Sequence, residues 1–325
     1  MSQFRYRASI AWLVATVAVA TLAAACAGGL RRETPRGPAA KAPGHLRIRL
    51  TDGAVRRVAL EEYVRGTIIS EFAPAAGDPS TVSRMLEVQA VIARSYAIAN
   101  LTRHSREGFN LCSTTHCQLY QPARLKTSTW ARAAAGAAQR TSGMVLWHGG
   151  SAATALYHAD CGGHTSGDGE VWGGAAHPYL VAVADDGPAR TAHAAWRFEV
   201  EEARLVSALN ADGKTRVGRQ LKGIAILERD RGGRARLVAL RGTRDPLVRG
   251  EELRLALSRA FGPKAIRSTR FDVTQSGSTY VFTGQGFGHG VGLCQAGALA
   301  RLRAGARPDQ VLARYYPGTQ LVVLR

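Results

Sequence analysis

One glutamate stands in a setting that suits acid–base chemistry. Glu71 follows Ile68 and Ile69 closely and is itself followed by Phe72. Apolar neighbours disfavour the charged carboxylate and so raise its pKa. A carboxyl group that keeps its proton near neutral pH can donate that proton to a leaving group. The alternative is that Glu71 is an ordinary charge at a helix end or on the surface.

A second set of residues has the chemistry of metal ligands. Cys112 and Cys117 are separated by four residues, and His116 is one of the four. Thiolate and imidazole are the ligands that tetrahedral zinc prefers, although this spacing differs from the tight C-x-x-C pair. Further candidate ligands are His104, His158, Cys161 and His164. The same thiols also suit a Cys112–Cys117 or Cys161-linked disulfide, and free thiols are the third reading.

A glycine-rich loop is the third feature that could serve a ligand. Glycines alternate with other residues from Gly284 to Gly292, and His289 lies within this loop. Because glycine has no side chain, such a loop lets the backbone approach a bound molecule closely. Taken alone the pattern is also typical of phosphate-binding loops and of simple turns, and His289 suits a structural role equally well.

The elements that would position these residues are mixed in type. Asp78-Pro79 is typical of a helix start, and apolar residues then recur at helical spacing, which predicts a helix over Ser80–Asn100. Asp52-Gly53 predicts a hairpin turn. Further expected strands lie at 46–50, 55–60, 145–147, 155–158, 224–227, 236–241 and 270–274, and further helices at about 295–303 and 308–316; 197–208 mixes both signals. Strands and helices without regular alternation favour an α+β fold.

The N-terminus has the pattern of an export signal. Arg5 and Arg7 precede an apolar run over Ile10–Ala25, which is shorter than a membrane-spanning helix and ends at Cys26. The sequence Leu22–Cys26 is similar to a bacterial lipobox, so we expect lipidation of Cys26. Simple cleavage with release and an uncleaved anchor are the alternatives. We expect a signal peptide at 1–25, a Pro/Gly-rich tether at 26–45 and one mixed domain at 46–325.

The charge of the chain fits a polyanionic partner. The 325 residues carry 43 Lys+Arg against 24 Asp+Glu, a formal charge of +19. Cleavage before Cys26 would leave 41 basic residues against 24 acidic ones, or +17. A basic excess first indicates nucleic acid, but an exported body meets cell-wall polymers and lipid head groups instead. The alternative is that the charge only aids solubility.

Several separated motifs, in the right order, resemble the SpoIID/LytB family from about Leu46 to the C-terminus. They are E-Y-V-R-G-T-I-I-S-E at 62–71, A-R-S-Y-A at 93–97 and G-F-G-H-G-V-G-L-C-Q at 286–295. The resemblance implies action on bacterial peptidoglycan in the periplasm or cell envelope. It implies a lytic transglycosylase in which Glu71 is first acid and then base, while the muramyl C6 hydroxyl attacks and leaves a 1,6-anhydro end.

The resemblance also implies a substrate groove and the residues that line it. Those residues would be Arg94, Tyr96, Gln118, Tyr120, His289 and Gln295. Arg94 would hold Glu71 or a sugar carboxylate, because guanidinium forms paired bonds with planar oxyanions; Tyr96 also suits core packing. Some relatives hold zinc near the segment that corresponds to Cys112, His116 and Cys117, so we expect a structural zinc at most and no cofactor for the chemistry.

Some positions depart from the family pattern. The usual E-M-P is Glu71-Phe72-Ala73-Pro74, and the common tryptophan of the glycine-rich loop is Phe287. The second change reduces the tryptophan platform on which a sugar could stack. A different class of function is a non-catalytic, glycan-binding enhancer of a cell-wall amidase. A DNA-binding protein, which the charge alone would favour, is the weakest reading, and we expect no nucleic-acid partner.

Overall fold

The computed structural model describes residues 41–185 and 195–325 of the chain. The expected signal peptide, Cys26 and most of the expected tether therefore lie outside the described residues. The predicted α+β class is confirmed, since helices are mixed with several small sheets of two or three strands. Within the described ranges, no helix combines the length and apolar character needed to cross a membrane.

The fold begins with a hairpin that leads directly into the first helix. Strands β1 (His45–Arg49) and β2 (Val55–Ala59) pair antiparallel, and the Asp52 side chain closes the turn by accepting a hydrogen bond from the Ala54 N–H. The next helix, α1 (Leu60–Glu71), begins one residue after β2 and buries one side against the rest of the lobe. Glu71 is therefore the last residue of α1.

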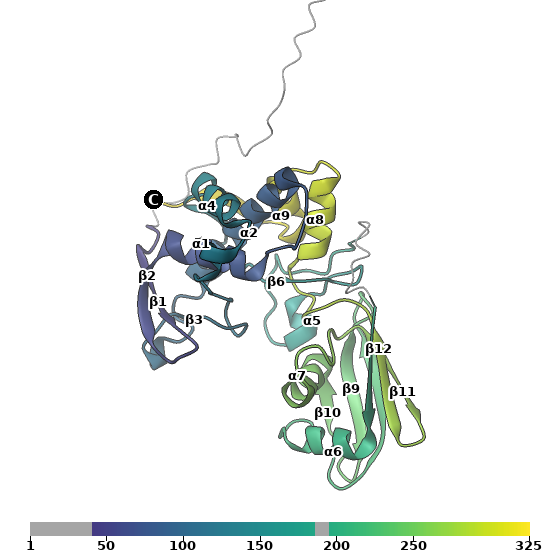
Figure 1. The fold of residues 1–325 in the computed structure, drawn as a ribbon. Coiled ribbons are helices and arrows are strands. Elements are labelled where there is room, and N and C mark those ends of the chain that lie inside the picture. Colours follow the sequence, from purple (N-terminus) through teal and green to yellow (C-terminus); the bar gives the residue numbers. More distant parts are fainter. Residues whose placement is uncertain (1–40, 186–194) are drawn as a thin grey trace, which may run out of the picture.

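The central element is helix α2 (Pro79–Ala99), which matches the predicted helix to within one residue at each end. The Asp78 side chain accepts a hydrogen bond from the Thr81 N–H. Pro79 lies in the first turn, where the backbone N–H that proline lacks would have no partner within the helix. Opposite faces of α2 belong to two apolar cores: Val88 and Ile92 face one, while Leu86 and Ala93 face the other. A helix that is apolar on both sides is buried by neighbouring elements on both sides. Figure 1 shows α2 inside a bundle of helices.

The remaining elements of this helical lobe come from both ends of the chain. The first part supplies η1 (Ser105–Glu107), β3 (Leu111–Cys112), α3 (Arg124–Thr127), α4 (Ala131–Arg140), β4 (Met144–His148), β5 (Ser151–Ala152), β6 (Tyr157–His158) and α5 (Asp168–Trp172). The C-terminal part supplies β13 (Leu293–Cys294), α8 (Gln295–Arg303), α9 (Pro308–Tyr315) and β14 (Gln320–Val323). β13 pairs with β6 and β14 with β4, so the C-terminal segment completes both small sheets.

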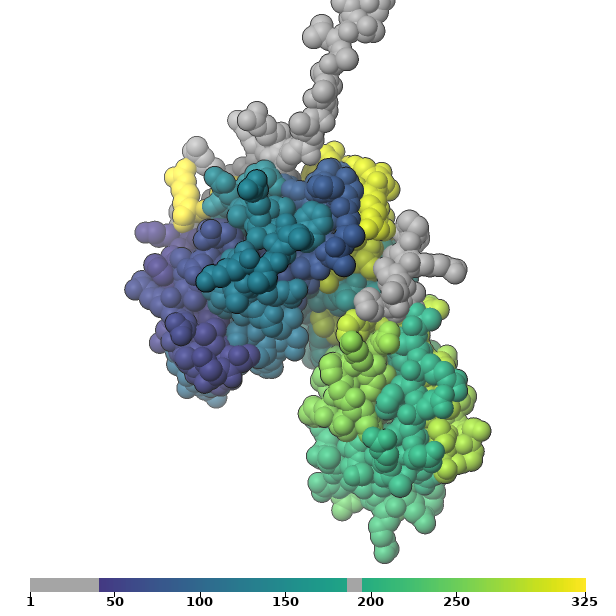
Figure 2. Space-filling model, viewed as in Figure 1, coloured from purple at the N-terminus to yellow at the C-terminus, as the bar shows by residue number. Residues whose placement is uncertain are grey.

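A second lobe is inserted between these two parts. It contains β7 (Trp196–Glu201), α6 (Glu202–Asn210), β8 (Leu221–Arg229), β9 (Ala235–Gly242), β10 (Leu247–Arg249), α7 (Gly250–Phe261), β11 (Phe271–Ser276) and β12 (Thr279–Gly284). Its apolar core draws all its fully buried members from residues 196–282. The mixed signal at 197–208 is explained, since a strand ends there and a helix begins. Figure 2 shows this lobe, in green, projecting from the helical lobe with an open notch between them.

Candidate active site

The Glu71 carboxyl lies at the end of α1 and is half-buried. Its Oε1 atom accepts a hydrogen bond of 2.6 Å from the backbone N–H of Leu119. Burial raises the pKa of Glu71, while the bonds from Leu119 and from the Tyr157 hydroxyl act in the opposite direction, and burial dominates. The Glu71 carboxyl is thus partly shielded from water, and the side chain can hold a proton at a higher pH than an exposed glutamate does.

A chain of buried hydrogen bonds leads to this carboxyl. The Tyr63 hydroxyl donates to Oε1 of Gln118 at 3.0 Å, and Nε2 of Gln118 donates to the Tyr157 hydroxyl at 3.3 Å. The Tyr157 hydroxyl hydrogen-bonds Glu71 in turn. Burial raises the pKa of both tyrosines well above the usual value. Both therefore remain protonated donors, and every bond in the chain points toward the carboxylate.

Gln295 fixes the backbone behind the same glutamate. Its Nε2 atom lies 3.3 Å from the carbonyl oxygen of Glu71 and 3.1 Å from Oε1 of Gln89 on α2. The carbonyls of a helix's last turn have no partner inside the helix, so Gln295, the first residue of α8, supplies one for α1. We find Gln295 beside Glu71, as expected, but bound to its backbone.

His289 approaches Glu71 through Tyr157. Nδ1 of His289 accepts a bond of 3.0 Å from the Val291 N–H, and the ring also hydrogen-bonds the backbone of Tyr157. Burial lowers the pKa of His289 to about 4, so the ring is neutral at neutral pH. The ring of Trp172 lies 5.2 Å from that of His289, and Trp172 is 41% exposed. The exposed indole of Trp172 thus lies beside His289, and His289 in turn contacts the backbone of Tyr157, whose hydroxyl bonds Glu71.

Arg94 does not hold Glu71. Its guanidinium, which is fully buried, forms a paired contact with the carboxylate of Glu61 at 2.8 and 2.7 Å. It also donates to the carbonyl of Met144 at 3.0 Å. These bonds point the side chain toward the start of α1, whereas Glu71 is at its end. Arg94 thus ties α2 to α1 and β4, and the sequence-based expectation fails because the partner carboxylate is a different one.

The two candidate tyrosines pack in the core of the helical lobe. Tyr96 is 4% exposed and Tyr120 is 5% exposed, and both belong to the core around α1. The Tyr120 ring stacks on that of Tyr63, with 5.2 Å between the ring centres. A Cβ atom at Gly66 would come within 2.5 Å of the Tyr120 ring, which explains the glycine in the E-Y-V-R-G motif. Their contacts support the residues around Glu71.

A cluster of two cysteines and two histidines lies close to this region. The cluster consists of His104, Cys112, His116 and Cys117, whose donor atoms all lie within 4.8 Å of one another. Nδ1 of His116 is 3.6 Å from both sulfurs, and Nε2 of His104 is 3.3 Å from that of Cys117. Neither of these cysteines, nor Cys161 or Cys294, takes part in a disulfide in the described ranges.

These four donors fit a zinc ion. Two thiolates and two imidazoles form a common tetrahedral ligand set for structural zinc. The Nδ1 atom of His104 is hydrogen-bonded to the carboxylate of Glu107, which leaves Nε2 facing the cluster. A carboxylate behind a ligating histidine is a typical support of such a site. His104, which the sequence offered only as an additional ligand, thus completes the predicted trio of Cys112, His116 and Cys117.

Comparison with known proteins agrees with this arrangement. Residues 51–148 match the family SpoIID, described as Stage II sporulation protein, and residues 188–292 match a domain of unknown function, DUF8618. Over 286 residues the chain is 26% identical to Stage II sporulation protein D of Bacillus subtilis, covering 84% of this chain and 77% of the relative. Residues 51–148 therefore belong to the SpoIID family. The family match covers Glu71 and the cysteine–histidine cluster, and the DUF8618 match covers the inserted lobe.

Other relatives extend the SpoIID likeness to most of the chain. An Amidase enhancer of Bacillus subtilis is 27% identical over 280 residues, which cover 73% of this chain but only 37% of the relative. An uncharacterized protein of Brachyspira hyodysenteriae is 27% identical over 274 residues, 82% of this chain and 68% of that protein. Both alignments reach well beyond the SpoIID match at 51–148.

Three residues of this site were not predicted from the sequence. They are Tyr63, Leu119 and Tyr157, which contact Glu71 directly or through Gln118. Tyr63 stands within the 62–71 motif and Tyr157 within the expected strand at 155–158, so their places were visible but their roles were not. Leu119 acts through its backbone, which leaves no signal in the side-chain sequence.

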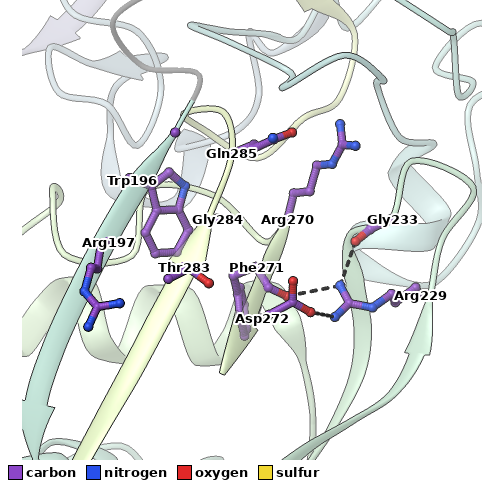
Figure 3. Close-up of a pocket in the computed structure, with 11 residues that line it drawn as sticks. Trp196, Arg197, Arg229, Gly233, Arg270, Phe271, Asp272, Thr283, Gly284 and Gln285 are labelled. Carbon is purple, nitrogen blue, oxygen red and sulfur yellow. Dashed lines mark hydrogen bonds and ion pairs between the residues drawn. The ribbon is translucent and has the colours of Figure 1, made fainter. Parts of the chain in front are cut away.

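A cavity of about 890 Å³ lies in the inserted lobe, away from Glu71 (Figure 3). Trp196, Arg197, Arg229, Arg270 and Asp272 are among its lining residues. Its arginines are engaged within the fold: Arg229 contacts Asp272, and Arg270 donates to the carbonyl of Gly162. The charged side chains that line this cavity are thus partly paired with other groups of the protein.

Proposed function

We propose that this chain cleaves the glycan strands of peptidoglycan as a lytic transglycosylase, with Glu71 as the acid and then the base. The observation that carries the proposal is the half-buried carboxyl of Glu71, whose pKa burial raises, held by the Leu119 N–H and the Tyr157 hydroxyl. A general acid works best when its pKa lies near the working pH. Strands denuded of stem peptides are the expected substrate.

The chemistry requires one carboxyl group. Protonated Glu71 donates its hydrogen to the glycosidic oxygen as the bond from that oxygen to the muramyl C1 breaks. The resulting carboxylate then accepts the proton of the muramyl C6 hydroxyl while that oxygen bonds to C1, which closes the 1,6-anhydro ring and regenerates the acid. Ordinary hydrolysis needs a second carboxylate. The intramolecular attack of the C6 hydroxyl removes that need, so Glu71 alone can serve as acid and base.

Trp172 and the positive charge support a sugar polymer as the substrate. The exposed indole of Trp172 can stack on a sugar ring in place of the tryptophan that the glycine-rich loop lacks. The formal charge of +19 for the whole chain favours a polymer that carries muramyl carboxylates. Export by the N-terminal segment, and attachment to a membrane through lipid on Cys26, would place the enzyme beside that polymer.

We further propose that a structural zinc ion occupies the cluster of His104, Cys112, His116 and Cys117. The ion would join the loop around β3 to the turn after α2, and this loop continues into Gln118 and Leu119. It would thus stabilise the segment that contacts Glu71. No step of the glycan chemistry is assigned to it.

The test is mass spectrometry of the products released from denuded glycan by the purified protein. The wild type should yield 1,6-anhydro-muramyl ends, and Glu71→Gln should yield none. The matched control is Glu62→Gln, which removes an exposed carboxylate from the same helix and should keep the wild-type yield. An undiminished yield from Glu71→Gln would exclude Glu71 as the acid.

A second function is favoured by one comparison. The likeness to an Amidase enhancer supports a glycan-binding role in which the chain stimulates a cell-wall amidase. Under that hypothesis, the wild type gives no anhydro product, Glu71→Gln still sediments with peptidoglycan, and both proteins accelerate amidase digestion equally. The two functions therefore differ in the product of the wild type acting alone.

A further inference from the structure

A second group of metal-ligating side chains lies behind the site, separate from the first. His158, Cys161 and Cys294 offer donor atoms that all lie within 4.8 Å of one another. All three residues are buried, at 5%, 0% and 0% exposure. Buried thiols and imidazoles that converge in this way are unusual in a core that could be filled by apolar side chains, and the function proposed above does not use them.

The pairing of two short strands brings these residues together. β6 and β13 run parallel, with Tyr157 opposite Leu293 and His158 opposite Cys294. Side chains that are opposite one another on neighbouring strands lie on the same face, and successive residues alternate between faces. Tyr157 therefore points to one side, toward Glu71, while His158 and Cys294 share the other side. Cys161 follows after a turn, and its N–H donates to the sulfur of Cys294 at 3.2 Å.

Backbone N–H groups surround both sulfurs. The Cys294 sulfur also accepts from the Gly297 N–H at 3.3 Å, and the Cys161 sulfur accepts from the Gly163 N–H at 3.2 Å. Metal ions bind cysteine as the thiolate, whose sulfur accepts hydrogen bonds from neighbouring groups of this kind. The fold thus prepares both sulfurs as ligands.

The histidine has the orientation of a metal ligand. Nδ1 of His158 lies 3.1 Å from the carbonyl oxygen of Val291 and donates to it, since a carbonyl can only accept. Nε2 is then the nitrogen with a free lone pair, and it is buried without a hydrogen-bond partner in the described part of the chain. Leaving such a group without a partner is unfavourable. A backbone carbonyl behind the distal nitrogen is a typical support for a ligating imidazole.

We propose that Cys161, Cys294 and His158 bind a zinc ion, distinct from the ion of the first cluster. The ion would replace the two thiol protons, which leave to solvent, so two thiolates balance its double charge. Three protein ligands leave the fourth position of a tetrahedral zinc ion to water. Asp185 lies just outside the trio: its Oδ2 atom is 3.3 Å from the Cys161 sulfur and already accepts a hydrogen bond of 2.8 Å from the Tyr315 hydroxyl. No oxidant or reductant is needed.

The ion would fix the elements that support Glu71. Cys294 is the residue that caps α8, directly before Gln295, and His158 directly follows Tyr157. A single ion would therefore join the strand that carries one contact of Glu71 to the helix that carries another. This inference does not rest on the glycan chemistry, because the site would bind its ion in an enzyme and in a non-catalytic enhancer alike.

The test is the zinc content of the purified full chain, measured by elemental mass spectrometry beside the protein concentration. The decisive quantity is the difference from wild type, because the first cluster contributes equally to both proteins. Cys294→Ser should lose one equivalent of zinc, and so should His158→Gln, which leaves the helix cap intact. The matched control is His164→Gln, a nearby histidine outside the cluster, which should lose none.

Two results would overturn the proposal. One is a zinc content that does not change in folded Cys294→Ser and His158→Gln. The other is a disulfide between Cys161 and Cys294 in the wild type. It would be detected as two cysteines that are not alkylated in the denatured protein until a reductant is added. If Cys294→Ser fails to fold, His158→Gln alone decides, with cobalt in place of zinc. Loss of the thiolate-to-cobalt absorption of one site would support the proposal, and an unchanged spectrum would refute it.

Discussion

The substitution Tyr157→Phe tests how the buried hydrogen bonds control Glu71. It removes a single hydroxyl, which accepts from Gln118 and hydrogen-bonds the Glu71 carboxyl. That bond lowers the pKa of Glu71, so its loss should raise this pKa further. The carboxyl should then titrate at a higher pH, and the pH at which glycan cleavage declines should move upward with it.

The size of the effect on stability follows from the two bonds that are lost. A hydrogen bond to a charged group contributes about 1.5–3 kcal/mol, and we take the lower end because Glu71 is only half-buried. The amide of Gln118, which is 1% exposed, loses its acceptor, which costs about 1–3 kcal/mol. Tyr157→Phe should therefore lower the free energy of unfolding by about 2.5–4.5 kcal/mol at neutral pH. The control Tyr63→Phe removes one bond between neutral groups and leaves Oε1 of the same buried Gln118 without its donor, so it should cost about 1–3 kcal/mol.

The sign of the pH dependence is fixed by the raised pKa of Glu71. The folded state binds this proton more tightly than the unfolded state, so the stabilisation is fully present below the unfolded pKa of about 4.5 and is lost as pH rises through the folded pKa. Glu71→Gln should remove this decline, and Tyr157→Phe should extend it to higher pH. Urea unfolding at several pH values measures both effects.

The assay for the carboxyl itself is carbon NMR of glutamate-labelled protein, with the Glu71 signal assigned by its absence in Glu71→Gln. The titration midpoint should rise in Tyr157→Phe and change much less in Tyr63→Phe. A midpoint that stays constant or falls in Tyr157→Phe would refute the reasoning, because Tyr157 would then not stabilise the ionised form. Equal shifts in both variants would show that packing, and not the hydroxyl, is responsible.

Three further predictions concern the scaffold and the substrate. Arg94→Lys should lower the free energy of unfolding by about 2 kcal/mol. This is less than the loss of a fully buried ion pair costs, because the Glu61 side chain is 39% exposed. The cleavage rate per folded molecule should not change. Gly66→Ala should cost about 1–3 kcal/mol in urea unfolding, since its Cβ would meet Tyr120. Trp172→Ala should reduce sedimentation with peptidoglycan while changing stability by less than about 0.5 kcal/mol; unchanged sedimentation would exclude the stacking role.

The elements that the sequence predicts well are those determined by neighbouring residues. Helix α2 has its cap, its proline and its apolar spacing within one segment, and its observed bounds differ from the prediction by one residue. Helix α8 begins and ends at the predicted residues. By contrast, the insertion of a second lobe depends on which distant strands pair, and residues 46–325 gave no local sign of the separate core formed by 196–282.

The candidate site divides in the same way. Glu71 and the apolar residues beside it lie in one motif, so the setting that raises its pKa could be predicted. The partner of Arg94 could not, because Glu61 and Glu71 are both carboxylates on α1 and only the packing of two helices selects between them. Tyr157 was missed for a related reason, since a tyrosine in a two-residue strand gives no indication of what its hydroxyl contacts.

The inserted lobe has a consequence for the order in which the protein can become active. Glu71 and Leu119 belong to the first part of the chain, whereas Gln295 and the strand that pairs with β6 follow the insertion. A chain that emerges from its N-terminus folds early segments first. The support for Glu71 is therefore incomplete until nearly the whole polypeptide is available to fold. A chain arrested after residue 284 would keep its glutamate but lack α8, so the support of Glu71 is completed only late in folding.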